Sequence, residues 1–432
     1  MKKLFLILLL LLPARIFADQ VSDIQAQMSA AETQRDALLA QQKVLQAQID
    51  AASAQGASLQ TTIDTLEASK KKIDNDLKIT QSSITSDTLD IKKLTLTIGE
   101  KQQEVADQKQ AIAESMRQLA SYDSTSFLSN LLTDGNIAVI WQDEQHLNDL
   151  QDNLQNEIQD LQSAQIVLGK QKNQKVADTS QLADLQSQLS GQKQTVQSTQ
   201  DAQSKLLSET KGQEASYQAL LANNIAQEKV FEDQLFQFES QLKVTVNVSS
   251  FPSPSHGILT WPVDKIKITQ MFGKTTDSGR LYASGTHDGV DFGTPVGSPV
   301  HAVRQGVIEG MGNTDEMNAT LKSEGIPGCY SYGRWILIQH DDGLSSIYGH
   351  LSSAIVSVGQ QVQAGQIIGY SGGAPGAYGS GYSTGPHVHL GLYATDAVKI
   401  ERYTTSIGCK LESIPIAPPN GYLDPLAYLP SL

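Results

Sequence analysis

The sequence predicts two unlike parts, a long α-helical coiled-coil hairpin followed by an all-β domain built on an antiparallel sheet. No proline occurs between Pro13 and Pro252, and proline costs about 3 kcal/mol inside a helix. The same stretch repeats apolar residues at every seventh position, which is typical of coiled coils. After Pro252, short runs of alternating apolar and polar residues punctuated by glycine indicate β-strands instead.

Residues 1–18 have the layout of a secretory signal peptide. Two lysines follow Met1, an apolar run extends from Leu4 to Leu12, and a small-residue cleavage site would end at Ala18. The run is short for a membrane span, which needs about 20 residues, although an uncleaved anchor is the alternative. We therefore expect an exported protein, located in the periplasm, the cell envelope or outside the cell.

Residues 19–245 are predicted to form the coiled-coil hairpin. One heptad series extends from Ile63 to Leu119, and eight of its nine positions are apolar. A second extends from Leu147 to Gln203 with seven of nine apolar positions. The segment 121–143 interrupts the heptads near the middle of this part. We therefore expect two antiparallel arms rather than one continuous rod, acting either as a spacer or as a partner-binding element.

A linker at 246–256, rich in serine and proline, leads into the β domain at 257–432. The formal net charge of the chain is −14. An acidic chain without basic clusters argues against nucleic acid as a partner.

Cys329 and Cys409 are the only cysteines. In an exported protein such a pair suggests one disulfide, with two free thiols as the alternative. Neither cysteine lies in a CxxC motif, which argues against zinc binding by these residues.

Four of the eight histidines lie in three short motifs of the β domain. These are His287-Asp-Gly-Val-Asp291, Tyr348-Gly-His350-Leu and His387-Val-His389. Side chains two apart on a strand point the same way, so His387 and His389 are expected to face one cleft. The motifs together offer enough nitrogen and oxygen ligands for zinc and leave imidazoles for proton transfer. Structural zinc sites usually fill all four positions, commonly with cysteine, so the pattern favours a hydrolytic site.

The order of these motifs and the glycines in and around them resemble those of the M23 family of zinc metallopeptidases, the lysostaphin-like or LytM-type peptidoglycan endopeptidases. The resemblance covers about Gly257 to Leu429. It includes Trp261-Pro, Gly285-Thr-His-Asp-Gly-Val-Asp-Phe, Tyr348-Gly-His-Leu and Ser383-Thr-Gly-Pro-His-Val-His-Leu. It implies an M23-type peptidase domain that binds Zn²⁺ and acts on peptidoglycan.

By this resemblance the zinc ligands are His287, Asp291 and His389. His350 and His387 take the family's two catalytic histidine positions, with His387 expected as the general base. Tyr282 lies close to the position of a tyrosine that helps to stabilise the oxyanion in some relatives. All five metal and histidine positions are present, unlike in degenerate relatives that have lost ligands.

The chain is longer than a minimal domain of that family at Met311–Gly333 and Gly372–Tyr382, and we expect both segments to border the cleft. Residues 396–423 are also long, and a Cys329–Cys409 bridge would tie two of these additions together.

The N-terminal part more loosely resembles the coiled coils of division-associated cell-wall hydrolases and activators. That resemblance implies docking on a membrane transporter-like complex and control of the catalytic domain. We therefore expect an exported, zinc-dependent peptidoglycan endopeptidase regulated by its coiled coil. The alternatives are a weakly active or inactive zinc-binding activator, and an envelope scaffold.

Overall fold

The computed structural model describes residues 12–53, 58–123, 137–242, 247–273, 287–316, 332–402 and 413–432. Tyr282, Cys329 and Cys409 lie outside these ranges, as do most of the expected signal peptide and much of the interruption at 121–143. The chain divides into two compact units. One contains residues 1–34 and 82–185, and the other contains residues 35–81 and 186–432.

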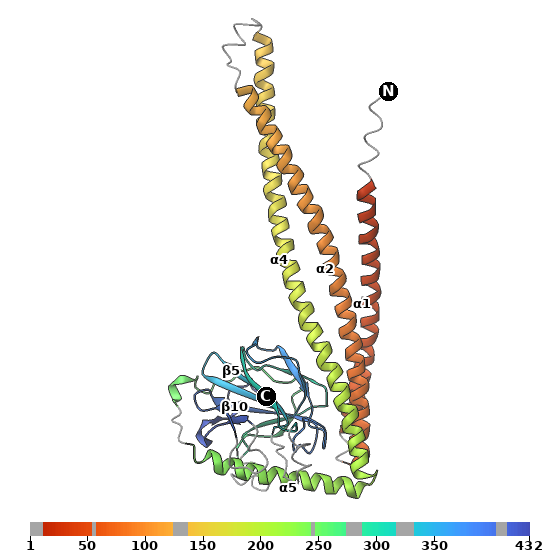
Figure 1. The fold of residues 1–432 in the computed structure, drawn as a ribbon, viewed down its shortest axis with the longest axis vertical. Helices are drawn as coiled ribbons and strands as arrows, with labels where there is room; N and C mark the ends of the chain where they lie inside the picture. Colours follow the sequence, from red (N-terminus) through yellow and green to blue (C-terminus); the bar gives the residue numbers. More distant parts are fainter. Residues whose placement is uncertain are drawn as a thin grey trace. The chain divides into compact units, whose positions relative to one another are not determined.

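Long helices form the N-terminal half, as predicted (Figure 1). The helices are α1 (Leu12–Ser53), α2 (Leu59–Asp123), α4 (Ile137–Thr210) and α5 (Glu214–Glu239). Several heptad positions of α2 are buried, including Ile84, Ile98, Val105 and Ile112. Burial of this apolar stripe, rather than helix propensity alone, holds helices of such length together.

Helices α2 and α4 run antiparallel within each unit. Residues with higher numbers on α2 form hydrogen bonds with residues with lower numbers on α4. The hydrogen bonds join Gln181 to Asp87 and Ser115 to Glu157 in one unit, and Gln203 to Glu67 in the other.

The first arm contains two helices. Helix α1 precedes α2 as a separate element, and its Gln42 donates a hydrogen bond to Asp76 of α2. The Ser58 hydroxyl accepts a hydrogen bond from the Thr61 amide at 3.1 Å. Such a serine satisfies an otherwise unpaired amide of a helix's first turn. The local cap therefore starts a new helix that the heptad pattern alone does not reveal.

The β domain is antiparallel, as predicted, and three sheets are present in the part of the chain that the structure describes. The largest has the order β1-β2-β10-β6-β5-β4-β8, with β13 also pairing with β10; the others are β3-β9-β7 and β11-β12. The strands are β1 (Ile268–Gln270), β2 (Gly289–Gly293), β3 (Pro299–His301), β4 (Gly306–Asn313), β5 (Arg334–His340), β6 (Leu344–Gly349), β7 (Leu351–Ala354), β8 (Gln361–Val362), β9 (Ile367–Ser371), β10 (His387–Ala394), β11 (Lys399–Arg402), β12 (Ser413–Ile416) and β13 (Tyr422–Leu423). Short 3₁₀ helices occur at Val248–Ser250, Pro419–Gly421 and Pro425–Ala427.

Strand β10 lies between β2 and β6 and separates the core from the functional face. Its Val388, Leu390 and Leu392 are fully buried and belong to the main apolar cluster of the domain. Alternation along the strand places His387 and His389 on the opposite face. Burial of the apolar residues therefore fixes the direction of the two histidines.

Helix α4 packs closely on β7 within the second unit. The Thr195 hydroxyl lies 2.8 Å from the Ser353 hydroxyl and 3.1 Å from that of Ser352. One helical turn earlier, a Cβ atom at Gly191 would lie 2.1 Å from a methyl carbon of Ile355. Only glycine fits at this contact.

The C-terminal end of α5 is attached to the β domain through a buried carboxyl group. Glu239 accepts hydrogen bonds from the Ala417 amide and the Tyr422 hydroxyl. Burial raises the pKa of Glu239 to about 8, because the two hydrogen bonds only partly offset the cost of desolvating the charge.

None of the helices in the described residues is long and apolar enough to span a membrane.

We predict that Glu239→Gln stabilises the protein increasingly as the pH rises from 5 to 8. The folded-state pKa of Glu239 lies above its unfolded value, so its stabilising contribution is lost as the pH rises through this range. Glutamine can accept the same two hydrogen bonds without ionising. The gain in free energy of unfolding relative to wild type should grow by up to about 4 kcal/mol, as measured by denaturant unfolding at both pH values.

Glu214→Gln at the other end of α5 is the matched control. Hydrogen bonds from Gln218 and the Leu59 amide lower the pKa of Glu214, so this residue is ionised across the whole range and its substitution should have a pH-independent effect. Equal effects of Glu239→Gln at pH 5 and pH 8 would contradict the assignment of a raised pKa.

Candidate active site

The register of β2 and β10 brings two of the predicted ligands together. Asp291 is paired directly with His389, and Gly289 is paired with Gly391. Paired residues in antiparallel strands point to the same face, so the carboxylate and the imidazole meet there. A Cβ atom at Gly289 would lie 2.6 Å from the His389 ring. The glycine of the first motif therefore leaves the space that this ring occupies.

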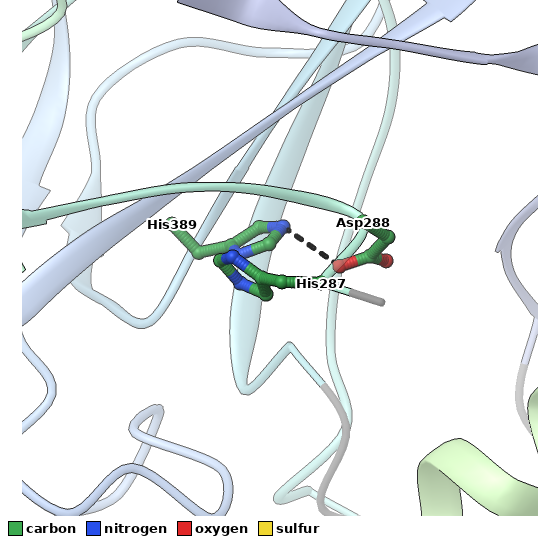
Figure 2. A group of neighbouring side chains, drawn as sticks. All are labelled: His287, Asp288 and His389. Atoms are coloured by element: carbon green, nitrogen blue, oxygen red, sulfur yellow. Dashed lines mark ion pairs between the residues drawn. The ribbon is translucent and has the colours of Figure 1, made fainter. Parts of the chain in front are cut away.

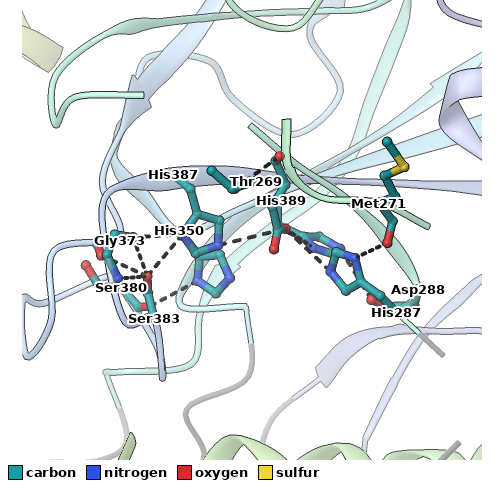
Figure 3. Close-up of polar contacts among 12 residues, drawn as sticks. Thr269, Met271, His287, Asp288, His350, Gly373, Ser380, Ser383, His387 and His389 are labelled. Atoms are coloured by element: carbon teal, nitrogen blue, oxygen red, sulfur yellow. Dashed lines mark hydrogen bonds and ion pairs between the residues drawn. The ribbon is translucent and has the colours of Figure 1, made fainter. Parts of the chain in front are cut away.

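Three imidazoles surround the buried Asp291 carboxylate. Figure 3 shows the three rings, those of His287, His387 and His389, close to one another. Its Oδ1 lies 3.0 Å from His389 Nδ1, 3.4 Å from His287 Nε2 and 3.8 Å from His387 Nε2. Burial alone would raise the pKa of Asp291, but the neighbouring imidazoles hold it well below its usual range. Burial similarly lowers the pKa of His287, but the nearby Asp291 and Asp288 carboxylates outweigh this effect and raise it to about 9.

The structure thus brings His287, Asp291 and His389 together as the sequence predicts. His287 Nδ1 lies 3.1 Å from the Met271 carbonyl oxygen, which fixes this nitrogen as the donor and directs Nε2 towards Asp291. Two imidazole nitrogens and a carboxylate oxygen converging in this way suit a catalytic zinc ion, which takes three protein ligands and keeps one open position. This donor set fits the predicted metal.

Asp288 also belongs to the cluster, which the motif analysis did not anticipate (Figure 2). One ligand atom from each of His287, Asp288 and His389 lies within 4.8 Å of the others. Asp288 Oδ1 lies 3.5 Å from His389 Nε2, on the side of the ring away from Asp291.

Backbone carbonyls of the glycine-rich region orient the two predicted catalytic histidines. His387 Nδ1 lies 2.8 Å from the Gly385 carbonyl oxygen and 3.2 Å from the Ser383 hydroxyl. His350 Nδ1 lies 3.0 Å from the Ser380 carbonyl oxygen. A carbonyl can only accept, so each Nδ1 carries a proton, and the neutral form of each ring has its lone pair on Nε2.

The two rings are close neighbours, with centroids 4.6 Å apart. Burial and the adjacent imidazoles of His387 and His389 lower the pKa of His350 well below its usual range. His350 is therefore a neutral imidazole. Its φ of 58° is left-handed, a conformation that few residues other than glycine adopt.

The loop 372–383 borders the site, as predicted, and is itself anchored. The Asp315 carboxylate accepts hydrogen bonds from the amides of Gly379 at 2.7 Å and Gly381 at 3.2 Å. Because Ser380 lies between these two glycines, its carbonyl is held where it meets His350. No sequence pattern marks the roles of Ser380, Ser383 or Asp315, since these are long-range contacts of ordinary loop residues.

Comparison with known proteins places these residues in a recognised domain. Residues 285–400 match the model of peptidase family M23. The glycyl-glycine endopeptidase ALE-1 of Staphylococcus capitis is 41% identical over 107 residues, which cover 24% of each chain. The peptidoglycan DD-endopeptidase ShyA of Vibrio cholerae is 35% identical over 106 residues, covering 24% of this chain and 20% of that one.

Among solved structures, the catalytic domain of lysostaphin from Staphylococcus simulans is 30% identical. The match covers 33% of this chain and 86% of that one, with a TM-score of 0.24. The chain spans only 24% of the length of ALE-1 and 20% of the length of ShyA.

We predict that His350→Gly is more stable than His350→Ala by about 1 kcal/mol, because the left-handed conformation costs alanine but not glycine. Both variants lack the imidazole, so the difference isolates the backbone strain. Thermal and denaturant unfolding of the metal-free proteins would measure it. Ala354→Gly, at a position of β7 without positive φ, should instead lose roughly 0.5–1 kcal/mol. An advantage of His350→Ala over His350→Gly would show that the backbone at this position is unstrained.

Proposed function

Because residues 285–400 are a peptidase family M23 domain, we propose that this protein is an exported zinc-dependent endopeptidase that cleaves peptide cross-links of peptidoglycan. The observation that carries the proposal is the convergence of His287 and His389 on Asp291, with the adjacent rings of His387 and His350 left for proton transfer. The names of relatives, a peptidoglycan DD-endopeptidase and a glycyl-glycine endopeptidase, support this substrate class.

In the proposed mechanism, His287 Nε2, Asp291 Oδ1 and His389 Nδ1 would hold the metal. Bound zinc would supply Lewis-acid activation of the scissile carbonyl and of a water molecule. His387 is placed to accept a proton at Nε2, because its Nδ1 lies against the Gly385 carbonyl and its Nε2 faces the site. The same nitrogen can then return the proton to the leaving amine.

His350 has a different role in this proposal. It is neutral, and its Nδ1–H is committed to the Ser380 carbonyl. Its ring lies beside that of His387, so it is placed to assist proton handling or to stabilise the tetrahedral intermediate. In this proposal His389 is a metal ligand and His387 is the general base, although the two residues lie only two apart on one strand.

We predict that His389→Ala and His387→Ala separate metal binding from turnover. His389→Ala should lose bound zinc and digestion of purified peptidoglycan together. His387→Ala should keep zinc and lose about 10²–10⁴-fold in rate, the usual contribution of a general base. Metal analysis and muropeptide release measure the two effects.

His301→Ala is the control, since His301 pairs with Asp264 outside the site. Undiminished digestion by His389→Ala would contradict the mechanism. If a zinc-binding wild-type protein released no muropeptide, the alternative of an activator or scaffold would be favoured.

We further propose that the helices restrain this site. In the second unit, Leu206 of α4 and Tyr217 of α5 belong to one buried apolar cluster with Ala374 and Ala377 of the loop 372–383. Asn224 of α5 donates a hydrogen bond to the Ser383 carbonyl at 3.3 Å. The Ser383 hydroxyl in turn contacts His387. Movement of α4 and α5 would therefore alter the loop that orients both catalytic histidines.

We propose the membrane transporter-like complex expected from the sequence as the source of the signal that moves these helices. Export follows from the same proposal, because peptidoglycan lies outside the cytoplasm.

We predict that Leu206→Asp raises the rate of peptidoglycan digestion, whereas Leu207→Asp leaves it unchanged. Leu206 is 1% exposed within the cluster, while its neighbour Leu207 is 42% exposed. A buried carboxylate would disrupt the packing of α4 on the loop. If the helices restrain the site, the rate should rise by about fivefold or more, the lower end of typical coupling between sites.

Muropeptide release by the full-length variants measures this rate. Equal or lower activity of Leu206→Asp, with zinc content and folding intact, would show that the helices support the active site rather than restrain it.

A further inference from the structure

The proposed ligand set uses only Nδ1 of His389 and does not say what the second ring nitrogen, Nε2, binds. The Nδ1 of His389 faces Asp291, while its Nε2 is buried and has no hydrogen-bond partner among the residues that the structure describes. When Nδ1 binds a metal through its lone pair, Nε2 must carry the proton. A buried N–H without an acceptor costs free energy, so an acceptor is expected close to it.

The Asp288 carboxylate is placed to be that acceptor. Its Oδ1 lies 3.5 Å from His389 Nε2, slightly beyond a normal hydrogen bond. Its side chain is 20% exposed, so protein surrounds most of the carboxylate. Figure 2 shows the Asp288 carboxylate beside the His389 ring.

Tyr332 holds the Asp288 carboxylate in this position. Its hydroxyl donates a hydrogen bond to Asp288 Oδ2 at 3.1 Å, and its ring centroid lies 5.8 Å from that of His389. The backbone of Tyr332 contributes as well, because its carbonyl accepts a hydrogen bond from the His350 amide at 2.7 Å. One buried residue therefore contacts both the metal-binding and the catalytic side of the site.

We propose that Asp288 is a positioning residue for the metal ligand His389, and that Tyr332 orients Asp288. Carboxylates that accept the outer N–H of a metal-bound histidine fix its tautomer and ring orientation and increase its basicity. In this proposal the Asp288 carboxylate accepts the outer N–H of His389. The Met271 carbonyl has the same role for the outer N–H of His287. The inference rests on the proposed zinc site but assigns residues that the site's ligand set does not include.

The same hydroxyl network continues away from the metal site. Tyr332 lies 3.3 Å from the Tyr393 hydroxyl, oxygen to oxygen, and the Tyr393 ring lies near that of Tyr422 with centroids 4.9 Å apart. Tyr422 donates to Glu239 at the end of α5. A series of buried polar groups therefore extends from a metal ligand to the helix that is attached to this domain.

We predict that Asp288→Ala lowers zinc affinity by about 10–100-fold, the usual effect of removing such an outer partner. Asp288→Asn should stay within a few-fold of wild type, because its amide oxygen can still accept the His389 proton. Tyr332→Phe should lose about 3–10-fold, as expected for one hydrogen bond. Competition with a chromogenic chelator measures affinity on the full-length protein, and the visible spectrum of the cobalt-loaded protein reports the ligand set.

The cobalt spectrum at saturation should be the same in Asp288→Ala and wild type, because the three ligands are unchanged. If Asp288 is itself a ligand, both Asp288 variants should lose affinity equally and alter the spectrum. Unchanged affinity in Asp288→Ala would overturn the proposal. The melting temperature of the metal-free variants should match that of the wild type, which separates positioning from folding.

Asp264→Ala provides the control for loss of charge, since Asp264 forms the corresponding carboxylate–histidine pair with His301 outside the site at 3.0 Å. It should leave zinc affinity unchanged. A wild-type protein that binds no zinc would instead refute the proposed function, so failure of that function and failure of this inference are distinguishable.

Discussion

The buried carboxylate of Asp291 is the constraint on which the site and much of the sheet depend. An uncompensated charge in the interior costs several kcal/mol, so this residue requires partners that are both close and fixed. His389 is supplied by the neighbouring strand, and a shift of one residue in the pairing of β2 with β10 would turn it to the other face. The apolar residues that alternate with the ligands, Val290 and Phe292 among them, enforce the same register from the core side. Pairing of β2 with β10 therefore forms the sheet and brings Asp291 and His389 together at the same time.

The protein uses two different means to place its functional groups. Strand pairing positions Asp291 and His389, and it tolerates little variation because side-chain direction is set by the pleat. His350 and His387 are instead oriented by carbonyls of a glycine-rich loop, which Asp315 and Asn224 hold from outside. In the proposed function, this division would let the helices act on His350 and His387 through the loop, while strand pairing holds Asp291 and His389.

The sequence predicted the two-part architecture because it depends on local pattern, and the three motifs anticipated that His287, Asp291 and His389 lie together. Absence of proline identified the helices, and alternation around His387 and His389 identified a strand with one functional face. The heptad pattern did not reveal where α1 ends and α2 begins, because a single cap at Ser58 does not disturb the longer repeat. Asp288 lay within a predicted motif, yet its role depends on Tyr332, 44 residues away along the chain. Such a pairing has no periodic signature, and neither does the packing of α4 and α5 on the loop.

Gly191 and Thr195 have a consequence for the evolution of this architecture. A glycine within a helix costs roughly 1 kcal/mol relative to alanine, so its presence in α4 is compensated by the close approach to Ile355 and by the hydroxyl contacts with Ser352 and Ser353. The peptidase domain and its helices are therefore not freely interchangeable modules. A catalytic domain transplanted from a relative would need small or matching side chains on β7 and just beyond it to keep this contact.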